Sequence, residues 1–148
     1  MKRIILLALM ALPFSAMASI PEFTALVERY TNVDNVTTMS MDKDMIAMIA
    51  QDQDGLKEIN DMAIILTEES SLGEEIITAT KKIANDLNAE NIVSVDSTSE
   101  KISIYTLKSG DNISHIIMTI STEGQIGAIV ISGNIPADKI NELIHLQM

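Results

Sequence analysis

The apolar pattern of this chain changes from a helical to a strand-like period after Asn88, and this change most restricts the possible folds. Apolar and polar residues then alternate in the segments 91–97 and 101–107, and two more strand-like segments follow at 112–121 and 125–132. The last of these is apolar or small on both faces from Gly127 to Ile131, which is typical of a central strand. The links between them, STSE, KSGDN and STEG, are short and rich in turn-forming residues. Strands joined by such links run antiparallel, because a parallel connection needs a dozen or more residues. The sequence therefore predicts a four-stranded antiparallel meander.

The segments before this meander have the spacing of helices and short strands. A helix is expected from Pro21 to about Asn32, because apolar residues follow Phe23 at helical intervals. The runs at 36–41 (VTTMSM) and 62–66 (MAIIL) are typical of short strands. Residues 42–51 are expected to form a short helix, with Asp42 as its cap.

Two further helices are expected in the sequence, one before the meander and one after it. The stretch from Ser71 to Glu74 has the pattern of a capping box, in which each side chain bonds the other residue's amide. Pro136 is expected to open a final helix. Its inward residues would be Ile140, Leu143 and Ile144.

Together these elements predict an α+β fold. A four-stranded C-terminal meander and two earlier short strands would form a mostly antiparallel sheet, covered by about four helices in a two-layer domain. The strand order of the two earlier strands stays open at this stage. The domain is expected to span residues 19–148.

The first residues have the features of a secretory signal peptide. Lys2 and Arg3 precede an apolar stretch that ends at Pro13, and small residues follow up to Ala18. The apolar stretch is too short for a membrane span, which needs roughly 20 residues. We expect residues 1–18 to be cleaved after Ala18, leaving a periplasmic or secreted protein without a membrane anchor.

Composition argues against several classes of function. The net charge is −11, and removal of Lys2 and Arg3 with the leader makes it −13, which repels phosphate backbones. Aromatic residues make up 3% of the chain, so stacking on nucleic acid or sugars is disfavoured. The absence of cysteine excludes disulfides, thiolate metal sites and a lipoprotein anchor.

His115 is the first residue to consider for chemistry. Regular alternation would place it on one face of its strand with Ile113, Ile117 and Thr119, and we expect this to be the less covered face. A catalytic histidine needs a nucleophile or an acid partner, and the chain has no G-x-S-x-G, S-x-x-K or cysteine motif. A structural role is therefore favoured over catalysis, and His145 is too distant in sequence to suggest a zinc pair.

Four methionines within ten residues form a candidate metal site, which consists of Met39, Met41, Met45 and Met48. Soft thioethers suit copper(I), and the spacings M-x-M and M-x-x-M permit convergence. Methionine is also a common core residue, and Met45 and Met48 fit the apolar face of a short helix. Core packing is the favoured interpretation.

An acidic turn, Asp52 to Gly55, has part of the pattern of a calcium loop. Aligned on Gly55, the first ligand position falls on Ala50 and the last on Asp61 instead of glutamate. A simple turn is therefore favoured. The other acids are scattered along the chain, which is typical of a solvated surface.

Three stretches give the chain a family resemblance: FTALVERYTNVDNVTTMSMDKDMIAMI, GLKEINDMAIIL and GAIVISGNIPADKINELI. With these the chain resembles DUF4252, a family of small exported bacterial proteins of unknown function. The resemblance implies export in a Gram-negative bacterium, often as a lipoprotein, although this chain lacks the lipoprotein cysteine. It carries over no catalytic residues.

The leading functional expectation is an exported, non-catalytic module that binds an unidentified protein or small molecule, without a cofactor. The alternatives are a periplasmic copper-handling protein using the methionine cluster, or a hydrolase with an unrecognised acidic site.

Overall fold

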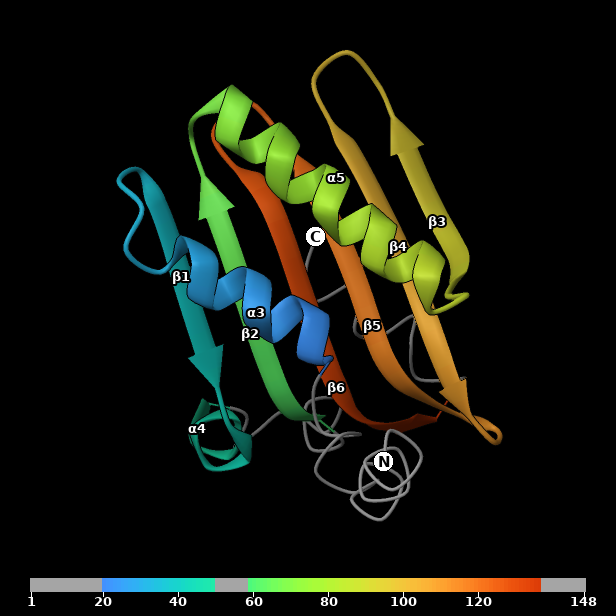
Figure 1. The fold of residues 1–148 in the computed structure, drawn as a ribbon. Coiled ribbons are helices and arrows are strands. Elements are labelled where there is room, and N and C mark those ends of the chain that lie inside the picture. The colour runs from blue at the N-terminus through green and yellow to red at the C-terminus, as the bar shows by residue number, and fades with distance from the viewer. Residues whose placement is uncertain (1–19, 50–58, 137–148) are drawn as a thin grey trace, which may run out of the picture.

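The structure, a computed structural model, describes residues 20–49 and 59–136. Its elements are α3 (Pro21–Tyr30), β1 (Val36–Met41), α4 (Lys43–Ile49), β2 (Ile59–Thr67), α5 (Ser70–Asp86), β3 (Glu90–Asp96), β4 (Lys101–Ser109), β5 (Asn112–Ser121) and β6 (Ile126–Pro136). The strands form one sheet in the order β1-β2-β6-β5-β4-β3, and every neighbouring pair is antiparallel (Figure 1).

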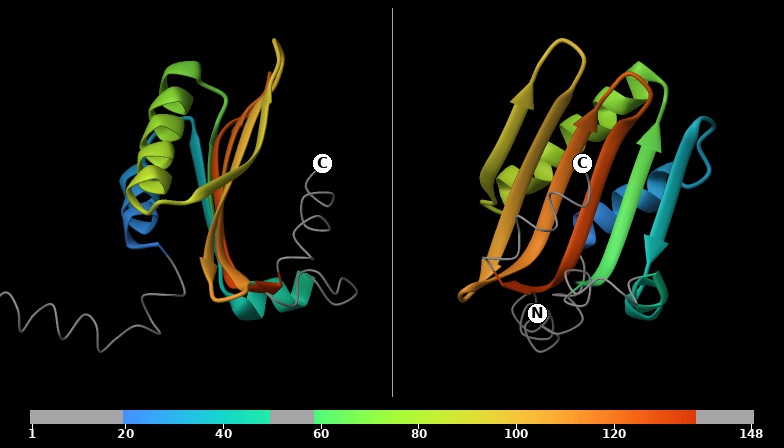
Figure 2. Two further views of the ribbon diagram at one scale, coloured as in Figure 1. Left: turned by 90° about the vertical axis from the view of Figure 1, so that its right-hand side faces the viewer. Right: turned by 180° about the vertical axis from the view of Figure 1, so that it is seen from behind.

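The predicted meander is present as β3 to β6. The two earlier strands, whose order the sequence left open, extend the sheet beyond β6, so β6 is an interior strand of the whole sheet. The strands β3 to β6 pair in succession, and β2 then pairs along the free side of β6. The helix α5 connects β2 to β3 by crossing the sheet from one side to the other (Figure 1). Both α3 and α5 lie on the same face of the sheet, which we call the front face (Figure 2).

The front face carries one of two hydrophobic cores. Phe23 of α3 and Ile76 of α5 are almost fully buried against the strands, as is Ile117 of β5. Full burial of such side chains stabilises the fold by roughly 1.5–3 kcal/mol each. The other buried members are Ile20, Leu26, Val27, Tyr30, Ile65, Ile83, Ala84, Ala128 and Val130.

The opposite face, which we call the back face, carries the second core. Ile46 of α4 packs here near the end of the sheet, together with Ile59. The other buried members are Ile104, Ile113, Ile116, Met118, Ile129, Ile131 and Ile135. Because β6 contributes buried residues to both cores, it is apolar on both sides, as expected for a central strand.

The helix expectations need correction. Among the described residues there are three helices, against about four predicted, and α4 lies at the end of the sheet without covering either face (Figure 2). Pro136 ends β6 and does not directly open a helix. The predicted final helix, the leader at 1–18 and the turn at Asp52–Gly55 fall on residues outside the described ranges.

The prediction of a capping box at Ser71 and Glu74 is wrong. The helix α5 begins at Ser70, and its N-cap is Glu69, which makes no side-chain capping bond. The Glu69 side chain instead accepts a hydrogen bond from Asn35 Nδ2 at 3.2 Å, and its backbone N–H donates to Thr67 Oγ1. Contacts from a distant loop and from β2 thus set the start of this helix.

Gly127 on β6 allows β2 to approach closely. A Cβ atom at this position would overlap the carbonyl oxygen of Ile65 in β2. We expect Gly127→Ala to lower the free energy of unfolding by roughly 1–3 kcal/mol, because either β2 or β6 must shift. Urea denaturation measures this difference.

Gly124→Ala is the matched control, since a Cβ atom there meets no atom within 4 Å. An equal loss of stability in both variants would contradict the proposed close approach of β2 to β6.

Candidate functional site

The four candidate methionines lie at one corner of the sheet, where β1 ends and α4 begins. Met39 pairs with Ile64 and Met41 pairs with Met62, so all four side chains share the back face. Met41 and Met62 are half-buried, whereas Met39 is 48% exposed.

The helix α4 places the other two methionines at the same corner. Asp42 caps it, because Oδ1 accepts a hydrogen bond from the Met45 backbone N–H at 2.9 Å, as predicted from the sequence. Ile46 of this helix is buried. Met45 and Met48 are 48% and 75% exposed, so core packing does not explain them. We call Met39, Met41, Met45, Met48 and Met62 the methionine surface.

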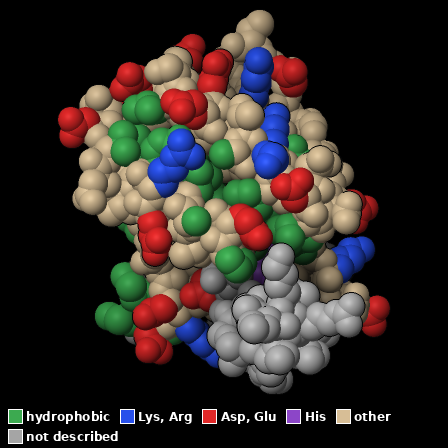
Figure 3. Space-filling model, viewed as in Figure 1, with side chains coloured by type: hydrophobic (Ala, Val, Ile, Leu, Met, Phe, Trp, Pro, Cys, Tyr) green, Lys and Arg blue, Asp and Glu red, His purple; other side chains and the backbone are tan. Residues whose placement is uncertain are grey.

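Acidic residues border the methionine surface. Asp42 and Asp44 lie at the start of α4, and Asp61 lies on β2 next to Met62. Burial, and to a lesser extent the charge of Asp42, raises the pKa of the Asp61 carboxyl above its usual value of 3.8. The corner of the molecule where α4 lies shows apolar side chains protruding beside acidic ones (Figure 3).

Oxygen and nitrogen ligands do not gather into a metal site in the part of the chain that the structure describes. No group of three or more His, Asp or Glu residues there is arranged to hold an ion. Thioether ligands are a different class, so copper binding by the methionines stays a prediction.

His115 is positioned differently from the sequence expectation. It is buried on the front face, not on the less covered one, with Leu107 and Ser132 as its strand partners. His115 does share a face with Ile117, as the alternation predicted, but this is the face that α3 and α5 cover. A bulge between Ile113 and His115, where Ser114 is the additional residue relative to β4, reverses the alternation before it. Ile113 therefore joins the back-face core and not the face of His115.

The His115 ring is held within the sheet. Ser114 Oγ lies 2.9 Å from Nδ1, and the same hydroxyl donates to the Leu107 carbonyl oxygen at 3.2 Å. A serine that bonds a backbone carbonyl at a bulge is positioned as a structural partner of the ring. A structural role for His115 stays a prediction.

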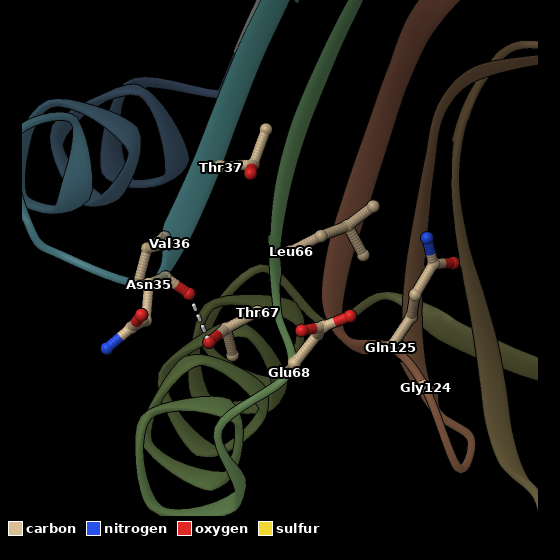
Figure 4. Close-up of a pocket in the computed structure, with 8 residues that line it drawn as sticks. All are labelled: Asn35, Val36, Thr37, Leu66, Thr67, Glu68, Gly124 and Gln125. Atoms are coloured by element: carbon tan, nitrogen blue, oxygen red, sulfur yellow. Dashed lines mark hydrogen bonds between the residues drawn. The ribbon is translucent and has the colours of Figure 1, made fainter.

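An open pocket of about 400 Å³ lies at the other end of β1 (Figure 4). Thr67 Oγ1 donates to the Asn35 carbonyl oxygen at 2.6 Å, which fixes the loop before β1. Glu68 supplies the single carboxylate of the lining and Gln125 an amide. This set can form hydrogen bonds to a ligand, but it lacks the paired acid and base that hydrolysis requires.

A second pocket, of about 300 Å³, lies between α5 and the front face of the sheet. Lys81 and Lys101 contribute amines, and the buried Thr119 contributes a hydroxyl. The rest of the lining is Glu74, Ile77, Thr78, Ser103 and Ser121. Sequence reasoning missed both pockets, because each joins residues from separate elements that no local motif connects.

None of the helices in residues 20–49 and 59–136 is long and apolar enough to cross a membrane.

The raised pKa of Asp61 gives a test of the acidic residues beside the methionine surface. The folded protein holds this proton more tightly than the unfolded chain, so the contribution of Asp61 to stability falls as pH rises from 3.8 through the folded pKa. We expect Asp61→Asn to raise the urea midpoint at pH 7. The gain should disappear at about pH 3, where the carboxyl is protonated in both states.

An Asp61→Asn variant that is less stable at pH 7 would contradict this account. It would mean that a favourable partner compensates the buried charge.

Comparison with known proteins gives one match. Residues 30–143 match the model of a family described as Domain of unknown function (DUF4252). No curated protein and no solved structure matches the chain.

Proposed function

Since this chain belongs to the DUF4252 family, whose description assigns no activity, we propose its function from its surface. It is an exported, non-catalytic interaction module that binds a partner protein through the methionine surface. Residues 1–18 are the cleaved leader, and the mature protein acts in the periplasm or outside the cell.

The exposure of the methionines is the observation that carries this proposal. Five large apolar side chains are clearly exposed in the described part of the chain, and three of them, Met39, Met45 and Met48, belong to this one corner. Grouped apolar exposure is typical of interaction sites, whereas single exposed residues are common on any protein. The flexible thioether also adapts to partner side chains, and methionine is frequent on binding surfaces.

The chemistry of the pockets supports binding over catalysis. The pocket at β1 offers one carboxylate and amide groups, and the pocket under α5 offers amines, hydroxyls and the Glu74 carboxylate. Among the described residues, no hydroxyl of either lining is hydrogen-bonded to a lysine or a carboxylate that could activate it as a nucleophile. His115 is buried away from both linings.

Site-specific photocrosslinking in the source cell tests the proposal. A benzoylphenylalanine at Met48 should give a discrete crosslinked species, because this side chain is 75% exposed at the centre of the proposed contact. The adduct is detected by immunoblot and identified by mass spectrometry.

The same photoreactive residue at Ile92 is the control, since Ile92 is 37% exposed on β3 at the opposite edge. Identical adducts from both positions, or none from Met48, would refute the proposed contact surface.

Copper(I) handling is the second candidate function, and the solvent access of three thioethers favours it. Anaerobic copper(I) titration should then show binding tighter than about micromolar. A variant with leucine at Met39, Met41, Met45 and Met48 should lose that binding while keeping an apolar surface. Unchanged affinity in this variant would exclude copper. A crosslink from position 48 that is retained with leucine at Met39, Met41 and Met45 would support the apolar contact.

A further inference from the structure

The two edges of the sheet differ in their protection, and we propose that the β1 edge binds an extended, basic segment of the partner as an added strand. This inference rests on the proposed function, because the added strand would lie beside the methionine surface. It specifies the kind of partner: a chain segment with apolar residues at alternate positions and lysine or arginine between or beside them.

The β3 edge carries features that prevent strand addition. Its pairing with β4 is interrupted between Asn91 and Val93, which leaves Ile92 as a bulged residue. Glu90 and Asp96 put a charge at each end of the strand. Bulges and charges are the usual means by which natural sheets keep an edge from pairing with another chain.

The β1 edge has neither feature. Its residues, VTTMSM, include no charge, proline or glycine. Its pairing with β2 runs without interruption from Val36 opposite Thr67 to Met41 opposite Met62. In the described residues the sheet ends at β1, so the outer backbone groups of this strand have no neighbouring strand. A regular, uncharged edge is a template for strand pairing.

The methionines determine which kind of side chain the added strand needs on its back-facing side. Residues paired across neighbouring strands share a face of the sheet, so back-facing residues of the added strand would lie beside Met39 and Met41. Met45 and Met48 would contact the end of the segment, because α4 follows directly after β1. Since strand side chains alternate between faces, the partner needs an apolar residue at every second position.

The charge at this edge selects a basic partner. Asp34 precedes β1, and Asp42 and Asp44 follow it, whereas Lys43 is the single basic residue between positions 31 and 49. Asp61 adds a further carboxyl beside the methionine surface, close enough to Asp42 to be repelled by it. A cationic side chain would relieve this repulsion. A second copy of the chain would bring the same acids to the contact and is disfavoured for that reason.

Fluorescence anisotropy of labelled peptides tests the proposal on the mature protein. The probe is a short peptide in which lysine alternates with valine or isoleucine. We expect saturable binding of this peptide and at least about tenfold weaker binding of a counterpart with glutamate in place of lysine. A peptide N-methylated at alternate backbone amides should also bind at least about tenfold more weakly, because strand pairing uses those amides.

Matched variants locate the site. Met39→Lys places a charge on the β1 edge and should weaken binding of the lysine peptide by at least about tenfold. Val95→Lys is the control, because Val95 is an exposed apolar residue on the same face of the opposite edge strand, and should change binding by less than about twofold. Circular dichroism melts confirm that both variants fold.

Three results would overturn the inference: equal binding of the glutamate peptide, equal losses in the two lysine variants, or no binding of the lysine peptide. Sedimentation that shows a dimer lost in Met39→Lys would replace the basic partner with a second copy. If the Met48 crosslink forms while the peptide does not bind, this inference fails alone. If that crosslink is absent as well, the proposed function fails with it.

Discussion

The pairing of β6 between β2 and β5 is the interaction on which the rest of the structure depends. Without β6 the sheet would separate into two pieces, the β1–β2 pair and the β3–β4–β5 meander. The same strand contributes buried residues to the cores on both faces. Two glycines make this position possible: Gly127 lets the β2 backbone approach, and Gly73 lets α5 pack on Ile126, whose side chain a Cβ atom would overlap.

This arrangement also determines which apolar surface remains exposed in the described residues. The helices α3 and α5 cover the front face, and the back-face residues of the central strands are buried. The outer strand β1 has one neighbour only, so Met39 is partly exposed although it lies on the same face as the back-face core. The short helix α4 then adds Met45 and Met48 at that corner, while Ile46 of the same helix packs into the back-face core.

Much of the fold could be predicted from periodicity, and the errors have physical causes. The strand-like pattern after Asn88 indicated the meander, because links this short allow consecutive strands to pair only in the antiparallel direction. The pairing of β2 with β6 joins residues far apart in sequence, which local patterns do not encode. The face of His115 was wrongly expected to be the less covered one, because the helices that cover it are placed by tertiary packing. One additional residue, Ser114, moved Ile113 to the opposite face. For the candidate site, the sequence located the methionines together but could not predict their exposure, because a thioether suits both a core and a surface.

The central place of the last strand also governs the order in which the fold can form. Synthesis delivers β6 after all the other described elements, so β2 and β5 have open edges until residues 126–136 have left the ribosome. Contacts between distant segments form slowly, and unpaired edges are prone to aggregation in the meantime. Before that point the β1–β2 pair and the β3–β4–β5 strands have no strand between them, so the cores on both faces lack the residues that β6 contributes.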